Sequence, residues 1–154
     1  MTRGGFLGVG AALRSADACA HPFADAPISA VDVRDVAACA AALLAVDAPD
    51  DRVGVRYDVT GPAAVRLGAE LARALSELHS RPVSIAACGV DEFLAARGLP
   101  PAAAANLAGF LAVLQTRCAE TTDVVAELTG RPAIDIGQHV RDYSADLSAT
   151  PPPP

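Results

Sequence analysis

Apolar positions along the chain follow two different periods. Residues 52–60 alternate between apolar and polar side chains, a pattern that is typical of a half-buried strand. Its apolar members are Val53, Val55, Tyr57 and Val59. Residues 63–79 instead place leucine at every third or fourth position, which predicts an amphipathic helix. The leucines are Leu67, Leu71, Leu75 and Leu78, and Pro62 suits the first turn of such a helix. Shorter strands are predicted at 28–33 and 83–87.

Capping residues place the remaining helices. Asp32 is expected to start a helix that runs to about Val46. Its apolar face would comprise Val36, Ala40, Leu43 and Leu44. Further helices are predicted at 91–98, from Pro100 onward, at 123–128 and at 135–147, where Asp135 and Gln138 match a capping box. In the helix after Pro100 we expect Leu107, Phe110, Leu111 and Leu114 to point inward.

These elements describe one helix-rich α/β domain with a few short strands. We expect an N-terminal loop and helix segment over 1–27, the domain proper over 28–148, and a disordered proline tail over 149–154. At 154 residues, the chain is long enough to bury one core.

Composition excludes several classes of function. The net charge is −6, which argues against nucleic acid as a partner, and no lysine is present for a Schiff base or a phosphate loop. The four cysteines lie far apart and are expected to be small buried residues, and the three histidines show no metal-ligand spacing. No apolar run reaches the roughly 18 residues of a membrane span, and the N-terminus lacks the regions of a signal peptide. We therefore expect a cytoplasmic protein without a metal.

Several segments, taken in order, resemble one family. Val31–Ala37 (VDVRDVA) and Tyr57–Pro62 (YDVTGP) each join a strand end to a helix start. The segments 71–83, 91–100 and 122–132 continue the match. Together they resemble the C-terminal half of an atypical short-chain dehydrogenase of the NmrA-like type, over about residues 28–147. The resemblance implies part of a Rossmann-type fold that lacks its N-terminal, dinucleotide-binding half.

The resemblance also implies NAD(P) as a cofactor, and the sequence departs from that expectation. Gly4, Gly5 and Phe6 look like the family's loop on the nicotinamide side. Alternatively, residues 5–8 look like the end of the first glycine-rich turn, although no apolar strand precedes them. A dinucleotide site needs a strand, a glycine turn and a helix N-terminus together. We therefore expect this chain alone to bind no cofactor.

The candidate site residues are few. Tyr57, Phe93, Phe110 and Leu114 could line a substrate pocket, but their positions suit a core equally well. Neither tyrosine has a lysine four residues on, so no catalytic residue is assigned. Asp32 and Asp35 are interpreted as helix-capping carboxylates, and His139 as a surface residue.

Three hypotheses about function remain open. The first is the substrate-side part of an NAD(P)H-dependent oxidoreductase whose cofactor domain is supplied elsewhere or lost. The second is a cofactor-free isomerase, cyclase or binding protein for a hydrophobic small molecule. The third is a non-catalytic regulatory module. In each case the family's missing sheet would leave an apolar face, so we expect a homodimer or a partner protein to cover it.

Overall fold

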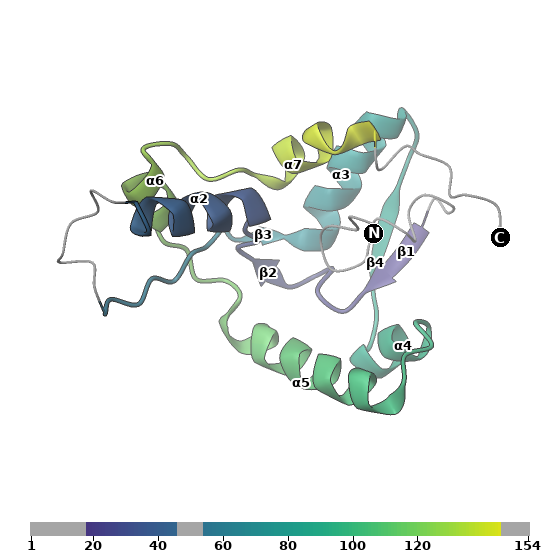
Figure 1. Ribbon diagram of the computed structural model, residues 1–154. Helices are drawn as coiled ribbons and strands as arrows, with labels where there is room; N and C mark the ends of the chain where they lie inside the picture. Colours follow the sequence, from purple (N-terminus) through teal and green to yellow (C-terminus); the bar gives the residue numbers. More distant parts are fainter. Residues whose placement is uncertain (1–17, 46–53, 146–154) are drawn as a thin grey trace.

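The computed structural model describes residues 18–45 and 54–145 (Figure 1). The proline tail and the glycine-rich segment that contains Gly4, Gly5 and Phe6 lie outside the described residues. No helix among those described combines the length and the apolar character needed to cross a membrane.

A short parallel sheet organises one end of the molecule. β1 (Ala18–His21) pairs with β4 (Ser84–Ala87), with Ala18 opposite Ser84 and His21 opposite Ala87. Parallel strands need a crossover between them, and the long connection here contains α3 (Leu67–His79). β2 (Pro27–Ile28) and β3 (Val65–Arg66) form a separate antiparallel pair. Residues 18–27 are thus integral to the folded unit.

The main core is built around α3. This helix packs along α7 (Ile136–Asp142) and against β4, as Figure 1 shows. The predicted leucine stripe is confirmed, because Leu67, Leu71 and Leu75 are buried and Leu78 packs against the core. Phe23, just after β1, is fully buried in the same core.

Two further helix pairs complete the fold. α2 (Val33–Leu43) packs against α6 (Val124–Thr129), where Cys39 and Val125 are buried. α4 (Val90–Ala95) leads into α5 (Pro101–Arg117), and the two pack against each other below the sheet in Figure 1. Leu111 joins α5 to the main core.

Three predicted strands can be compared with the structure. The one at 83–87 is confirmed as β4. The strand predicted over 28–33 is shorter, because β2 ends at Ile28 and Asp32 already caps α2. The strand predicted over 52–60 is wrong for its described part: residues 54–60 join no ladder among the described strands. An alternating pattern specifies an extended segment, but a strand also needs a neighbour to bond.

The first helical part of the chain also needs correction. The sequence predicts a loop that runs into a short helix before His21, but Ala18–His21 form β1, and the earlier part of that segment lies outside the described residues. The face predicted for α2 is wrong, because Val36 and Leu44 are 43% and 84% exposed. That helix turns Asp35 and Cys39 inward instead, since the buried carboxylate finds polar partners there.

The later helices begin or end away from their predicted limits. α3 begins at Leu67, five residues after Pro62, because β3 intervenes. Asp135 caps α7 as predicted, by accepting from the backbone N–H of Gln138. α7 ends at Asp142, before the predicted end near 147.

Candidate functional site

The carboxyl ends of β1 and β4 lie at one edge of the parallel sheet. His21 is the last residue of β1, and β4 ends at Ala87 directly before Cys88 and α4. In open α/β sheets, ligands bind beyond the carboxyl ends of the strands. This edge is therefore the candidate position for a binding site, and it contains a buried histidine, His21.

His21 is a buried polar side chain enclosed by aromatic rings. It is 1% exposed. Its ring meets that of Phe93 edge-on, with centroids 5.1 Å apart, and lies 5.7 Å from the ring of Phe23. The backbone N–H of Phe23 donates to Nδ1 of His21 over 3.2 Å. This bond fixes the ring's orientation.

The same bond determines which ring nitrogen of His21 carries the proton. Burial, and secondarily the charge of Arg97, lower the pKa of His21 to about 4, so the imidazole is neutral near pH 7. A neutral imidazole has one N–H, and because Nδ1 accepts a bond, the proton must reside on Nε2. Nε2 is buried and has no hydrogen-bond partner among the described residues. Such a donor costs about 1–3 kcal/mol when left unsatisfied.

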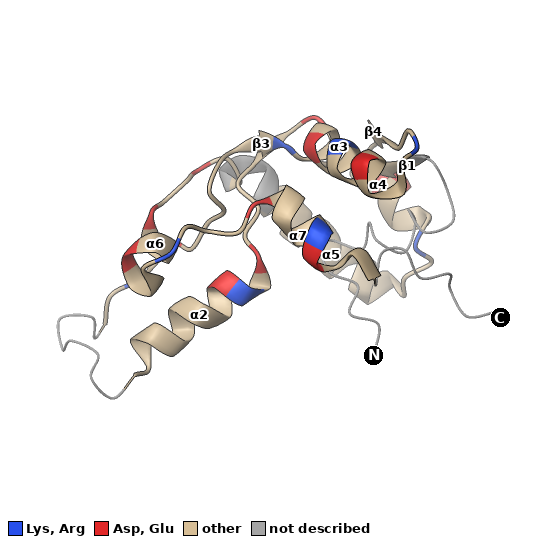
Figure 2. Cartoon of the chain, turned by 90° about the horizontal axis from the view of Figure 1, so that it is seen from above, with Lys and Arg blue, Asp and Glu red and all other residues tan. Residues whose placement is uncertain are grey.

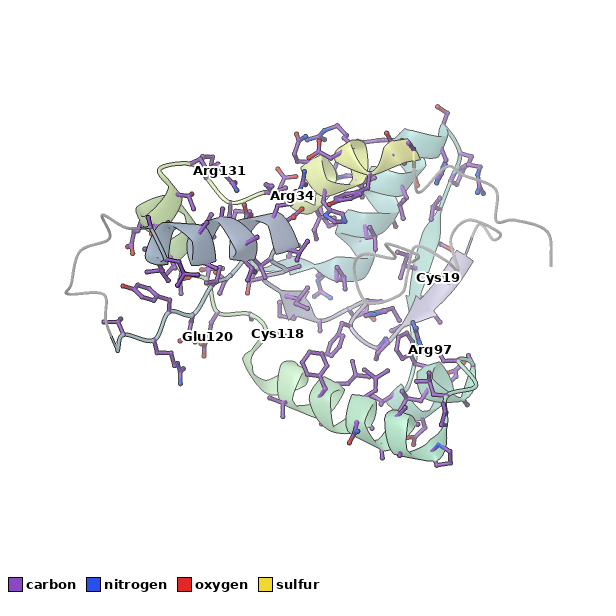
Figure 3. All side chains as sticks on the ribbon, in the orientation of Figure 1. Cys19, Arg34, Arg97, Cys118, Glu120 and Arg131 are labelled. Atoms are coloured by element: carbon purple, nitrogen blue, oxygen red, sulfur yellow. The ribbon has the colours of Figure 1, made fainter. Side chains whose placement is uncertain are left out.

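Arg97 brings positive charge to this edge. Its guanidinium carbon lies 3.9 Å from the centroid of the Phe93 ring, a cation–π contact. Figure 3 shows Arg97 between α4 and the end of β1, with Cys19 further back along the strand. Burial raises the pKa of the Cys19 and Cys88 thiols, so neither is a ready nucleophile. The edge thus offers a neutral N–H donor, an aromatic face and a cation, which we call the His21 site.

A second polar cluster ties α2 to α7. Asp32 caps α2 by accepting from the backbone N–H of Arg34 over 2.8 Å, and it also accepts from the Arg34 guanidinium. The Nδ1 atom of His139 lies 2.8 Å from Oδ2 of Asp32, and Arg34 also pairs with Asp142 over 2.7 Å. Although burial acts in the opposite direction, the bonds from Arg34 and His139 hold the pKa of Asp32 well below its usual range.

This cluster revises two predictions. His139 is no surface residue: its side chain is only 14% exposed and it joins two helices far apart in sequence. Asp32 caps α2 as predicted, and it also pairs with Arg34 and contacts His139. Asp35 is fully buried, accepts from the backbone N–H of Ile134, and pairs with Arg131 over 2.6 Å. These groups connect packed elements, so we assign them to the fold.

The structure does not bring the four predicted pocket residues together in one site. Phe93 belongs to the His21 site. Phe110 lies on α5 and is 52% exposed, so its predicted inward position is wrong. Tyr57 is half-buried in the segment 54–60, which lies at the opposite end of the molecule from α4 (Figure 1). The side chain of Leu114, like Gly4, Gly5 and Phe6, lies outside the described residues.

The sequence alone does not identify His21 and Arg97 as site residues. The sequence offers one indication of His21, because it interrupts the apolar stretch Ala18–Phe23. A polar residue that is buried within such a stretch is often functional. Arg97 follows a short helix and resembles any surface arginine. Only the pairing of β1 with β4 brings the two close to Phe93.

The described residues do not fit a dinucleotide. Such a site needs a glycine-rich turn between a strand and a helix N-terminus. Here the one described turn from a parallel strand into a helix, after β4, contains a single glycine and leads to six helical residues. In the part of the chain that the structure covers, no group of three or more metal-ligating side chains occurs either.

Searches by sequence find two curated relatives. The chain is 36% identical over 137 residues to a (4-alkanoyl-5-oxo-2,5-dihydrofuran-3-yl)methyl phosphate reductase of Streptomyces griseus, covering 87% of this chain and 46% of that protein. It is 30% identical over 132 residues to an NAD(P)H azoreductase of Xenophilus azovorans, covering 83% and 45%. No family model matches the chain. The chain thus spans about half the length of these relatives.

Solved structures share the fold. A Citrobacter triphenylmethane reductase complexed with NADP(H) superposes with a TM-score of 0.69 at 20% identity, over 86% of this chain and 46% of that one. An NADPH-dependent quinone oxidoreductase of Escherichia coli gives 0.72 at 22% identity, over 90% and 50%. The protein has a helix-rich α/β fold, and this fold matches the C-terminal half of NAD(P)H-dependent reductases.

Proposed function

We propose that this chain is the acceptor-binding part of an NmrA-like, NAD(P)H-dependent reductase, and that its substrate is a conjugated carbonyl compound. The kinship with reductases over half their length supports the reaction class. The buried, unpartnered Nε2–H of His21 is the observation that carries the assignment of the site. A donor in that state is satisfied by an oxygen acceptor, which a carbonyl group supplies.

Each residue of the His21 site has a distinct role. The Nε2–H of His21 donates to the carbonyl oxygen and stabilises negative charge as it develops there, which a neutral imidazole can do without giving up its proton. Phe93 offers its ring to a flat conjugated system. Arg97 holds an anionic substituent, such as the phosphate that the Streptomyces relative's substrate carries. Because His21 is 1% exposed, the side chains packed around it, which include Phe23 and Phe93, must move to admit the oxygen.

Under this proposal the dinucleotide belongs to another part of the reductase. The described residues of this chain contribute the acceptor side. The second relative is an NAD(P)H azoreductase, and two structural neighbours are an NADP(H)-bound reductase and an NADPH-dependent oxidoreductase, which supports a pyridine nucleotide as the reductant.

The alternative functions predict other behaviour of the same chain. A cofactor-free enzyme would convert a carbonyl ligand without any nucleotide. A regulatory module would bind a partner protein but no small acceptor. The His21 site favours the reductase, since nothing in a purely regulatory role requires a buried unsatisfied donor.

Titration with a quinone tests the proposal. We expect 2-methyl-1,4-naphthoquinone to bind the purified chain by calorimetry, and its sulfonated derivative to bind more tightly because of Arg97. In nitrogen NMR of the imidazole side chains, the free chain should show His21 protonated at Nε2, with a shift at that nitrogen upon binding. Binding without any change at His21 would contradict the site, and no binding would contradict the function.

Matched variants separate the site from general effects. His21→Asn keeps an acceptor near the N–H of Phe23 but removes the Nε2 donor, so the affinity should fall by about tenfold, as for one lost hydrogen bond. His79→Asn is the control, since His79 lies at the far end of α3, and it should leave the affinity unchanged. Arg97→Gln should weaken only the sulfonated ligand.

A further inference from the structure

The helix α4 covers His21 from one side. Its Phe93 ring meets the imidazole edge-on, with the centroids 5.1 Å apart. Figure 2 shows α4 at the same end of the molecule as β1 and β4, opposite α2 and α6. The other ring that packs on His21, that of Phe23, belongs to the loop after β1. With His21 only 1% exposed, part of this covering must move before a ligand reaches Nε2.

The backbone on the Phe23 side is held by several hydrogen bonds. The N–H of Phe23 donates to Nδ1 of His21, and the N–H of Ala24 donates to the His21 carbonyl over 3.1 Å. The carbonyl of Phe23 accepts from Ala26 over 3.2 Å, and that of Ala24 accepts from Gly68 of α3 over 2.9 Å. A large displacement here would break these bonds together, so the backbone movement belongs to the other side of the imidazole.

The backbone of α4 has no such ties. Among the described residues, every backbone-to-backbone hydrogen bond of residues 90–98 has its partner within 89–98. The buried side chains of Phe93 and Leu94, with the partly buried Val90, attach the helix to the main core. The helix can therefore leave the core as a unit and keep its own hydrogen bonds, which is the condition for a local opening.

A glycine stands at each end of α4. Gly89 caps the helix with φ −70° and ψ 152°, and a Cβ atom built there would meet nothing within 4 Å. Gly98 has φ +56°, in the left-handed region that favours glycine, and its Cβ would also meet nothing. At both positions the backbone dihedral angles can change with little steric resistance, as hinge residues require.

The next helix, α5, is anchored and does not follow this movement. Leu111 is 1% exposed and belongs to the main core. Directly after α5, the carbonyl of Cys118 accepts from the N–H of Ser29 over 2.6 Å and from its hydroxyl over 2.9 Å. The Cys118 thiol donates to the Pro27 carbonyl over 3.3 Å. Because α5 is held at two points, the second hinge lies before it, at Gly98.

We propose that α4 is a lid over the His21 site, hinged at Gly89 and Gly98, which opens to admit the acceptor and closes over it. Opening uncovers Nε2 of His21. Closure returns Phe93 and Arg97 to the bound molecule together, because their cation–π contact lies within the moving segment. The product leaves only when the lid opens again. The identity of the ligand rests on the proposed function, whereas the movement is a property of the free chain.

Rapid mixing with 2-methyl-1,4-naphthoquinone tests the lid. The observed binding rate should level off as the quinone concentration rises, because opening becomes rate-limiting. Gly89→Ala should lower this limiting rate by roughly two- to fivefold, since alanine restricts the hinge without a clash. Gly109→Ala, also in open space, is the matched control and should leave the rate unchanged. A binding rate that rises linearly to saturation of the site, or equal effects of the two variants, would overturn the proposal.

Hydrogen exchange tests the same movement without a ligand. In the free chain, the amides of α4 should exchange faster than those of α3 and α5. Leu94→Ala removes one attachment of the lid and should speed exchange in α4 by at least about tenfold, with α3 unchanged. Leu44→Ala, the same change at an 84% exposed position, is the control and should have no effect on α4.

The two experiments separate the lid from the proposed function. Protection of α4 equal to that of α3, or opening of α4 and α5 as one unit, would overturn the lid even if the quinone binds. Opening of α4 in a free chain that binds no quinone would support the lid and contradict the proposed function.

Discussion

The imidazole of His21 is fixed in orientation and tautomer by one backbone bond, from the N–H of Phe23. A side chain held this way presents the same N–H to any ligand. The buried imidazole of His21 also lowers the stability of the fold in acid, because burial disfavours its protonated form. Site and stability are therefore linked at this residue, and the link can be measured by changing the pH.

Acid should destabilise the protein through His21. An unfolded imidazole titrates near pH 6.5 and the folded one near 4, so between these values the unfolded state alone takes up the proton. We expect the free energy of unfolding to fall by roughly 3 kcal/mol from about pH 7 to pH 4, and this contribution then to level off. Urea unfolding at a series of pH values measures the decline.

Two variants test whether His21 causes this decline in the free energy of unfolding. His21→Asn should flatten the pH dependence over this window, whereas His79→Asn should retain most of it. Asp32 contributes only near the acid end of this window, because its folded-state pKa lies well below its usual range and its unfolded carboxyl takes up a proton only as the pH approaches 4. An unchanged slope in His21→Asn would contradict the neutral, buried imidazole.

Asp32 should be the more costly of two aspartates to neutralise. It is buried and joins the start of α2 to Arg34 and His139, whereas the Asp58–Arg56 pair is exposed. Asp32→Asn keeps the helix cap but removes the charge, and we expect a loss of about 2–4 kcal/mol. Asp58→Asn, an identical change at an exposed pair, should cost less than about 1 kcal/mol. Thermal or urea unfolding compares the two, and equal losses would contradict the buried network.

At the scale of elements, α3 approaches the loop after β1 closely at one glycine. A Cβ atom built on Gly68 would lie 2.8 Å from both the carbonyl oxygen and the Cβ of Ala24. The backbone N–H of Gly68 donates to that same carbonyl over 2.9 Å, so the backbone cannot yield easily. The helix can begin where it does only because this position has no side chain.

Alanine at two helical glycines should therefore have opposite effects. Gly68→Ala should destabilise the protein by about 1–3 kcal/mol through the clash with Ala24. Gly109→Ala, in α5, meets nothing within 4 Å and should stabilise it by about 0.5–1 kcal/mol, since alanine is the better helix former. Melting temperatures of the two variants test this prediction. A Gly68→Ala protein as stable as the unchanged protein would contradict the close approach of Gly68 to Ala24.

Local patterns predicted the elements whose partners lie nearby. The leucine spacing in 67–78 identified α3, and Asp32 and Asp135 identified two helix starts, because periodicity and capping act within one or two turns. β1 and the buried face of α2 were missed. Both depend on contacts with distant segments, β4 for the strand and Arg131 with Ile134 for Asp35.

At the scale of the molecule, family resemblance predicted more than periodicity did. The order of segments from Val31 to Pro132 indicated the C-terminal half of a reductase, and the comparisons agree at that coarser level. The site was not predictable in the same way. Phe93 was a candidate from its residue type, but His21 and Arg97 gain meaning only when β1, β4 and α4 are brought together.

The acceptor-binding role can be measured as NADPH-dependent reduction of 2-methyl-1,4-naphthoquinone by this chain mixed with the separately produced, unmatched half of the Streptomyces relative. We predict turnover only when both polypeptides are present, and a lower rate with His21→Asn at equal complex formation, measured in the same samples. Turnover by either part alone, or an inactive mixture in which the complex has formed, would contradict the claim that this chain is the acceptor-binding part of a reductase.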